Sequence, residues 1–220
     1  LGFSVIEDVF SPTALRERLE KPWKDWKLGT KVAIHTSLVL IIIGMGLYLL
    51  LEQNNTLKGM STLEKIVASF FQSVSTRTAG FNTVDFSQLA NPTLVFMIFL
   101  MFIGASSGST GGGIKTSTFL LISISSIATI RGKKNIDLGK RSISAELLSK
   151  AFSIFVFAAT FNLLMIFLLS ITESHLDILK IVFEQVSAFA TVGLSAGITA
   201  ELSIYGKVLI IISMFVGRIG

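Results

Sequence analysis

The chain has 220 residues, of which 51% are hydrophobic and 18 are phenylalanine, and its mean hydropathy is +0.72. This composition excludes an ordinary soluble domain and favours an integral membrane protein. The net charge of +5 comes from basic residues concentrated in residues 16–31 and 131–150, without the aromatic interleaving of a nucleic-acid surface, and the lack of cysteine excludes thiolate metal sites.

The first 28 residues are predicted to be the end of a preceding membrane repeat followed by a cytoplasmic linker. Residues 1–9 are interpreted as the tail of a segment that runs inward. Ser11-Pro12 then predicts the start of a short charged helix that ends near Glu20. Because the chain lacks an initial methionine and stops within an apolar helix at Gly220, we expect it to be a fragment.

Residues 29–130 are predicted to form one membrane module. The apolar segment from Lys31 to Leu51 is long enough, at about 1.5 Å per residue, to cross a hydrocarbon core about 30 Å thick. A capping box of Ser61 and Glu64 then opens an apolar helix that ends near Ser75. Because about 14 residues are too few to span the bilayer, we predict a re-entrant helix. The alternative is an amphipathic helix that lies on the membrane surface.

This module is predicted to end in a broken helix. Asn91-Pro92 starts an apolar stretch that reaches Ile130, which would measure about 57 Å as one straight helix and is too long for a single crossing. Its middle, residues 104–116, is rich in glycine and serine and therefore forms helix poorly. We expect two helices joined by an intramembrane loop.

Residues 131–146 are predicted to be a cytoplasmic linker, because basic residues gather there and before the first span, within residues 11–30. The second module, residues 147–220, has a span that ends near Ile171. A cap at Ser174-His175-Leu176-Asp177 then opens a second short helix, and a last apolar stretch starts near Lys207. Because the span before each short helix starts on the cytoplasmic side, both short helices enter the membrane from outside.

The two modules carry an internal repeat. Phe, Gln, Thr and Gly recur at an offset of 113 positions between residues 70–80 and residues 183–193. Residues 101–104 match residues 214–217 at the same offset. The sequence thus predicts an all-α integral membrane protein of repeated modules, each with a span, a short pore helix and a second span.

Each short helix is followed by a Thr-x-Gly turn. Successive carbonyls of such turns can replace the hydration shell of a potassium ion, and the C-terminal end of a helix favours a nearby cation. The predicted ion-binding groups are the backbones of Arg77, Thr78, Ala79, Gly80, Ala190, Thr191, Val192 and Gly193. Because a pore needs a closed ring of turns, either two copies assemble or a longer chain supplies two further repeats.

At these motifs the chain resembles the Trk/Ktr/HKT superfamily of potassium transporters, and most closely the membrane subunit of bacterial Ktr systems. Residues 75–82 and 108–115 resemble the filter and the intramembrane loop of the third repeat, and residues 190–195 with 217–220 resemble the fourth repeat. Neither turn has the second glycine of tetrameric channels. This departure leaves open how strictly potassium is selected over sodium.

The resemblance implies potassium uptake across the cell membrane by four repeats around one pathway, with the first two repeats missing from this chain. It also implies a homodimer on a cytosolic nucleotide-binding ring of the RCK/KtrA type. We expect no enzyme activity and no cofactor in this chain, with nucleotide acting only through that partner. Potassium is the expected substrate, and sodium stays open as a coupling or activating ion.

Arg218 lies about 16 Å past Lys207 along the last helix, near the middle of the bilayer. An arginine there costs at least about 2.5 to 3.5 kcal/mol unless it is partnered, which indicates a functional role. Snorkelling at a helix end is the alternative. From the resemblance, we predict a barrier formed by Gly104, Ser106, Ser107, Gly108, Ser109, Thr110, Gly111, Gly112, Gly113, Lys115 and Arg218, with hydrogen bonds from the serine and threonine side chains holding the loop.

Two other functions compete with this interpretation. Gly108 and Gly113 followed by Lys115-Thr116 nearly match a nucleotide-binding P-loop, but Ile114 interrupts the required Gly-Lys pair and no strand precedes it. A secondary carrier with discontinuous helices is the stronger rival. Carrier repeats are usually inverted, whereas the two modules predicted here run parallel.

Overall fold

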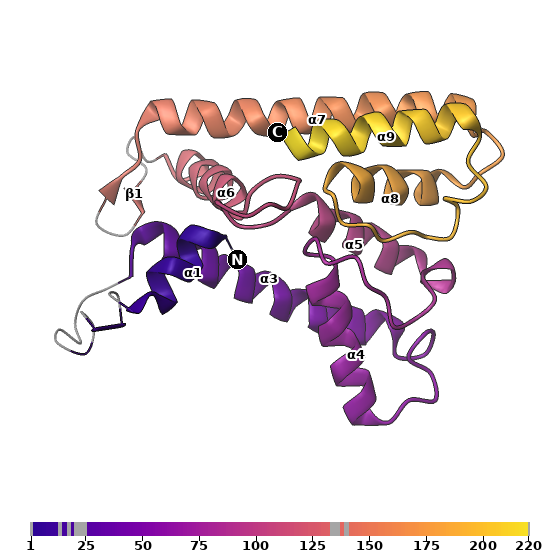
Figure 1. Ribbon diagram of the computed structural model, residues 1–220, viewed down its shortest axis with the longest axis horizontal. Helices are drawn as coiled ribbons and strands as arrows, with labels where there is room; N and C mark the ends of the chain where they lie inside the picture. The colour runs from indigo at the N-terminus through magenta and orange to yellow at the C-terminus, as the bar shows by residue number, and fades with distance from the viewer. Residues whose placement is uncertain are drawn as a thin grey trace.

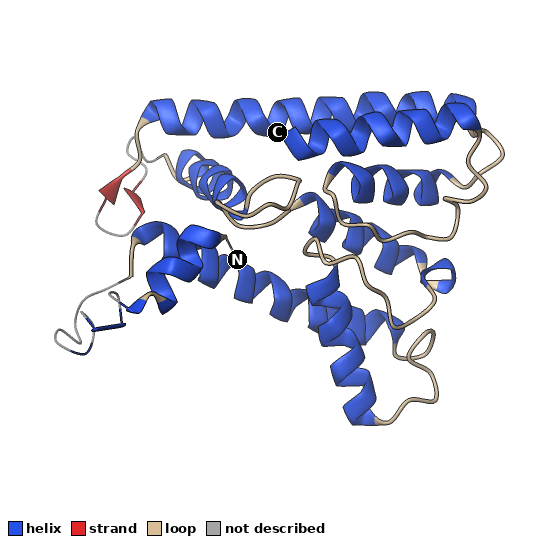
Figure 2. Ribbon diagram, viewed as in Figure 1, coloured by secondary structure: helices blue, strands red, loops and turns tan. Residues whose placement is uncertain are grey.

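In a computed structural model of the chain, the described residues are 2–12, 15, 16, 19, 26–132, 137, 138 and 141–219. Their regular secondary structure is almost entirely helical, which confirms the all-α prediction (Figure 2). A short antiparallel pair of strands, β1 (Asp137–Leu138) and β2 (Arg141–Ser142), was not predicted and lies in the basic linker. Most of the helix predicted to end near Glu20 falls outside the described residues, so that prediction stays open.

Among the described residues, two helices are long and apolar enough to cross a membrane. They are α3 (Leu28–Glu52) and α7 (Ala145–Thr172), with mean hydropathies of 2.2 and 2.5. Only 22% of the most apolar window of each helix is buried inside the chain, so neither is the core helix of a soluble domain. Their outward side chains, such as Ile42 and Leu163, are suited to contact lipid or further protein.

The two short helices are α4 (Thr62–Ser75) and α8 (Ile178–Phe189). The capping box at α4 is confirmed: the Ser61 N–H donates to Glu64 Oε2 at 2.7 Å, and the Glu64 N–H donates to Ser61 Oγ at 3.4 Å.

The cap predicted for α8 at Ser174 is wrong. The Leu176 N–H donates to the Glu173 carbonyl at 2.9 Å, so residues 173–176 form the turn that closes α7. Asp177 is then the residue with extended backbone before α8, and its Oδ1 accepts the Leu179 N–H at 3.0 Å. Both short helices thus begin at a side-chain cap, but with different chemistry.

The long apolar stretch is broken as predicted, into α5 (Asn91–Phe102) and α6 (Thr116–Ile130). We call the connection between them, residues 103–115, the Gly-rich loop. It folds back on itself, because the Gly104 N–H donates to the Ile114 carbonyl at 2.8 Å and the Thr116 N–H to the Ala105 carbonyl at 3.2 Å. A Cβ on Gly104 would lie 1.9 Å from the Gly112 carbonyl oxygen, so only glycine fits there.

The helices lie in an order that brings the two modules together (Figure 1). The last helix, α9 (Ile204–Ile219), runs beside α7, while α1 (Phe3–Phe10) packs against α3 and α6 lies between α3 and α7. In Figure 1, β1 and the start of α7 lie at one end of the molecule, and the connections after α3 and α7 lie at the other. The main core forms where α5 of the first module meets α8 of the second, around Phe86, Met97, Met101 and Phe183.

Candidate functional site

The two Thr-x-Gly turns share an unusual backbone conformation. Thr78 and Thr191 have φ angles of +67° and +54°, and within the described residues they are the only non-glycine residues with positive φ. Gly80 and Gly193 follow them with φ angles of +75° and +90°. A left-handed threonine costs about 1 to 2 kcal/mol, so the surrounding structure must impose it twice. The repeat seen in the sequence is therefore also a repeat of local structure.

A serine in the last part of each short helix ties down the chain after the turn. The Ser75 hydroxyl donates to the Phe81 carbonyl, and the Ser187 hydroxyl donates to the Leu194 carbonyl at 2.6 Å. The two carbonyls occupy equivalent positions, each directly after the glycine. These bonds bend the chain back toward its own helix and hold the turns in shape.

The turns of the two modules lie against each other. A Cβ on Gly80 would lie 2.1 Å from the Val192 carbonyl oxygen, and a Cβ on Gly193 would lie 3.9 Å from the Gly80 Cα. Glycine is required at residue 80 both for its φ angle and for this close approach. The residues predicted to bind ions are thus brought together from segments 113 positions apart.

The Gly-rich loop lies against both turns. The Gly112 N–H donates to Thr191 Oγ1 at 2.7 Å, and a Cβ on Gly111 would lie 2.8 Å from Thr78 Oγ1. A Cβ on Gly112 would also lie 2.8 Å from the carbonyl oxygen of Gly217, the neighbour of Arg218. The loop therefore contacts the turns of both modules and the last helix.

Two basic side chains bind the loop's own carbonyl oxygens. Lys115 Nζ donates to the Gly111 carbonyl at 2.5 Å, and Arg77 Nη2 donates to the Gly104 carbonyl at 3.0 Å. Arg77 was predicted only as a backbone ligand, so its link from the first turn to the loop was missed. A basic residue in a re-entrant turn was the available signal.

The hydroxyl groups predicted to hold the loop behave differently from one another. Ser106 is buried and accepts a backbone N–H, Ser107 shares a 2.5 Å hydrogen bond with Ser117, and Ser109 accepts the Gly111 N–H at 3.3 Å. Thr110 is exposed. The Arg218 side chain is exposed too, and it lies within electrostatic range of Lys115.

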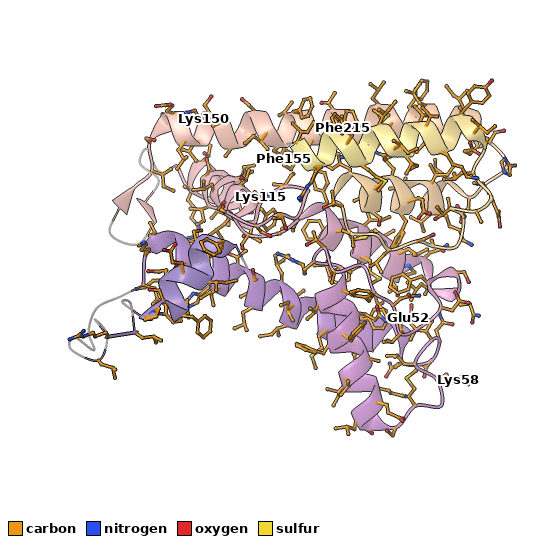
Figure 3. The ribbon with its side chains drawn as sticks, viewed as in Figure 1. Glu52, Lys58, Lys115, Lys150, Phe155 and Phe215 are labelled. Atoms are coloured by element: carbon orange, nitrogen blue, oxygen red, sulfur yellow. The ribbon has the colours of Figure 1, made fainter. Side chains whose placement is uncertain are left out.

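Sequence reasoning missed two buried glutamates at the ends of the long helices. Glu52 accepts the Ala90 N–H at 3.0 Å, just before α5, and Glu173 accepts the Ser203 N–H at 3.1 Å, just before α9. Both side chains are fully buried. Ala90 and Ser203 are again 113 positions apart. Each module thus caps its second span with a carboxylate that lies at the end of its own first span. Figure 3 shows Glu52 at the end of the molecule opposite Lys150.

The pKa of Glu173 reflects two opposing effects. Burial raises the pKa of this carboxyl, but hydrogen bonds from the Ser203 side chain and backbone stabilise the charged form and outweigh burial. The net result is a pKa below its ordinary value of 4.5. Glu173 is therefore ionised at neutral pH and acts as a charged cap.

The glutamine that recurs in both short helices anchors them. Gln185 accepts the Ser213 hydroxyl of α9 at 2.9 Å and donates to Asn162 of α7 at 3.3 Å, and it is fully buried. Gln72 donates to Thr83 Oγ1 at 2.8 Å, in the segment that follows the first turn. These bonds fix the position of each helix relative to its turn or its neighbouring spans.

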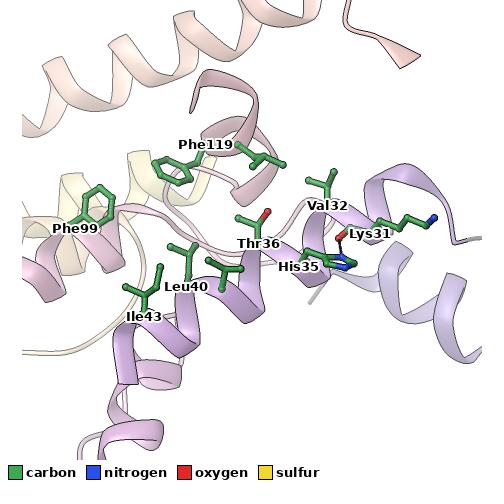
Figure 4. Close-up of a pocket in the computed structure, with 10 residues that line it drawn as sticks. Lys31, Val32, His35, Thr36, Leu40, Ile43, Phe99 and Phe119 are labelled. Carbon is green, nitrogen blue, oxygen red and sulfur yellow. Dashed lines mark hydrogen bonds between the residues drawn. The ribbon is translucent and has the colours of Figure 1, made fainter. Parts of the chain in front are cut away.

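A groove between α3 and the broken helix differs from the turns and the Gly-rich loop in its lining (Figure 4). Its lining includes Val32, Leu40, Phe99 and Phe119 and is almost wholly apolar. Such a lining offers few ligands for an ion. The candidate site therefore remains at the turns and the Gly-rich loop.

Comparison with known proteins shows the family of the chain. The model of the TrkH family, described as cation transport protein, matches residues 27–220. The chain belongs to the TrkH family of cation transport proteins. The chain is 42% identical to Ktr system potassium uptake protein B of Vibrio alginolyticus and 43% identical to the protein of the same name from Bacillus subtilis. Each match covers 100% of this chain but 47% and 48% of the relative.

Two further similar proteins extend the comparison. Potassium/sodium uptake protein NtpJ of Enterococcus hirae is 37% identical, over 100% of this chain and 48% of its own length. The crystal structure of the potassium transporter TrkH from Vibrio parahaemolyticus has a TM-score of 0.77 at 22% identity, covering 99% of this chain and 47% of that one. The fold is thus shared, and the chain spans about half the length of the relatives it matches.

Proposed function

We propose that this chain is part of a potassium uptake system of the cell membrane, in which residues 77–80 and 190–193 line a selectivity filter. The observation that carries the proposal is the contact between two left-handed Thr-x-Gly turns, made where Gly80 meets the Val192 carbonyl oxygen. Relatives are named potassium uptake proteins, which supports potassium as the ion.

The helix geometry supports a cation rather than an anion. Both α4 and α8 end at the turns, so the negative ends of their dipoles, each about half an elementary charge, lie beside the proposed ion path. Potassium can exchange its hydration shell for backbone carbonyls at modest cost. Because NtpJ is named a potassium/sodium uptake protein, sodium is the ion against which selectivity has to be tested.

Two further modules would complete the ring. In the first module, Met97 and Met101 on α5 are buried where α8 of the second module packs. Their equivalents on α9, Ile210 and Met214, instead border a cavity of about 250 Å³ that also exposes the second turn. An uncovered face of this kind fits a pore helix from another repeat.

The Gly-rich loop and Arg218 are proposed as the barrier to ion flow. The loop contacts both turns and lies beside Gly217, so an ion that leaves the filter meets the loop first. Lys115 and Arg218 add positive charge at the same place, which opposes a passing cation. Rearrangement of the loop would let ions through.

The assembly proposed for the full-length protein follows the family resemblance. It is a homodimer of four-repeat subunits on a cytosolic nucleotide-binding ring, which would receive the basic linker at residues 131–146. Nucleotide would act through that ring, and sodium coupling remains a question for transport assays.

The filter assignment is tested by potassium and sodium uptake in cells that lack their own uptake systems, with Gly80→Ser in the full-length protein. The added Cβ would meet the Val192 carbonyl oxygen, so we expect the preference for potassium over sodium to fall about tenfold, about 1.4 kcal/mol. Gly59→Ser is the matched control, because Gly59 also has positive φ, at +85°, but nothing within 4 Å of an added Cβ. An equal preference for potassium over sodium in both variants would contradict the filter assignment and favour a carrier.

A further inference from the structure

The Gly-rich loop is held on a second side by Gly2 and Phe3, at the start of α1. The Gly2 N–H donates to Ser106 Oγ at 2.7 Å, and both residues are buried. The Phe3 N–H donates to the Gly108 carbonyl at 3.1 Å. In Figure 1 the N-terminal end of α1 accordingly lies next to the connection between α5 and α6. Two backbone donors at the start of α1, which the helix itself cannot satisfy, are thus paired with the loop.

The fit between the two segments leaves no room for larger residues. A Cβ on Gly2 would lie 2.1 Å from the Ser107 carbonyl oxygen, although its φ of −75° suits any residue. Gly2 is therefore required for close approach. On the loop side, a Cβ on Gly108 would lie 2.8 Å from Ser4 Oγ.

The loop has two separate sets of contacts. Toward the turns it is bound through Gly112 and through Arg77. Toward α1 it is bound at Ser106 and Gly108, where residues 107 and 108 are otherwise exposed. A rearrangement that moves residues 106–108 has to break the second set, because these hydrogen bonds tie Ser106 and Gly108 to the start of α1.

We propose that Gly2–Ser4 is a latch that positions the Gly-rich loop across the ion path, so that displacement of α1 releases the barrier. This inference rests on the proposed role of the loop as the barrier. It assigns control over the opening of the path to α1, which packs against α3. The latch acts on the rate of ion flow and leaves ion selectivity to the turns.

A reversible cross-link tests the latch directly. A Cβ on Gly108 would lie 3.7 Å from the Ser4 Cβ, close to the mean of about 3.8 Å in disulfides, and the chain has no cysteine of its own. In full-length protein with Ser4→Cys and Gly108→Cys, we expect oxidation to form the disulfide and to lower potassium uptake at least about tenfold. Reduction should restore uptake in the same sample, and each single cysteine variant should not respond.

A second variant covers the case in which Gly108→Cys fails to fold. Gly2→Ala pushes α1 off the loop, so we expect faster potassium uptake at unchanged preference over sodium. Gly29→Ala is its control, because an added Cβ there has nothing within 4 Å. The latch would be overturned by a folded double-cysteine protein that does not cross-link, or by a cross-linked protein that transports as fast as it does after the disulfide is reduced. A Gly2→Ala variant that behaves like Gly29→Ala would overturn it too. If the unmodified full-length protein did not take up potassium at all, that result would instead contradict the proposed function.

Discussion

At the scale of single residues, the buried carboxylates at the ends of the long helices determine how each module closes. Replacing Glu173 by glutamine removes the charge that binds two donors of Ser203, and because an amide has one acceptor oxygen, it leaves one of these donors facing an N–H₂ group. Hydrogen bonds to charged groups contribute about 1.5 to 3 kcal/mol, so we expect Glu173→Gln to lower the unfolding free energy by that amount. Thermal unfolding in detergent measures it, with the exposed Glu201→Gln as the control.

The same carboxylate predicts a pH dependence of stability. Its pKa in the folded protein lies below the ordinary value of 4.5, so folding is favoured by this group above pH 4.5. That contribution is lost as the pH falls through the folded pKa. We expect the melting temperature of the unmodified protein to fall below pH 4.5 more steeply than that of Glu173→Gln. Parallel curves for the two proteins would show that the cap is not ionised.

At the scale of elements, the hydrogen bond from the Gly112 N–H to Thr191 Oγ1 couples the Gly-rich loop to the second turn. Thr191→Val keeps the shape of the side chain but leaves that N–H without its acceptor. A hydrogen bond of about 1 kcal/mol shifts an equilibrium about fivefold, so we expect a comparable rise in basal potassium uptake. Thr191→Ser retains the hydroxyl and should transport like the unmodified protein, whereas a rise in both variants would assign the effect to the turn itself.

Elements whose signals are local could be predicted from the sequence, and contacts between distant segments could not. The cap at Ser61 and the glycines between residues 104 and 113 act on their own neighbours, so α4 and the break between α5 and α6 were found. The binding of Gly2 to Ser106 joins residues 104 positions apart and leaves no periodic trace. The cap of α8 was misplaced because Ser174 has a capping side chain, while the turn after α7 decides which residue is extended.

At the scale of the whole molecule, the offset of 113 positions relates surfaces as well as motifs. Met101 is fully buried between the modules, but its equivalent Met214 on α9 is 51% exposed. If a further pore helix covers α9 as α8 covers α5, then a lipid-soluble diazirine, whose carbene inserts into C–H bonds and needs no thiolate, should label Met214 of the membrane-embedded full-length protein as weakly as Met101. Leu163, on the outer side of α7 and 68% exposed, should be labelled strongly. Strong labelling of Met214 would mean that α9 faces lipid, and the ring of turns would then have to close in another way.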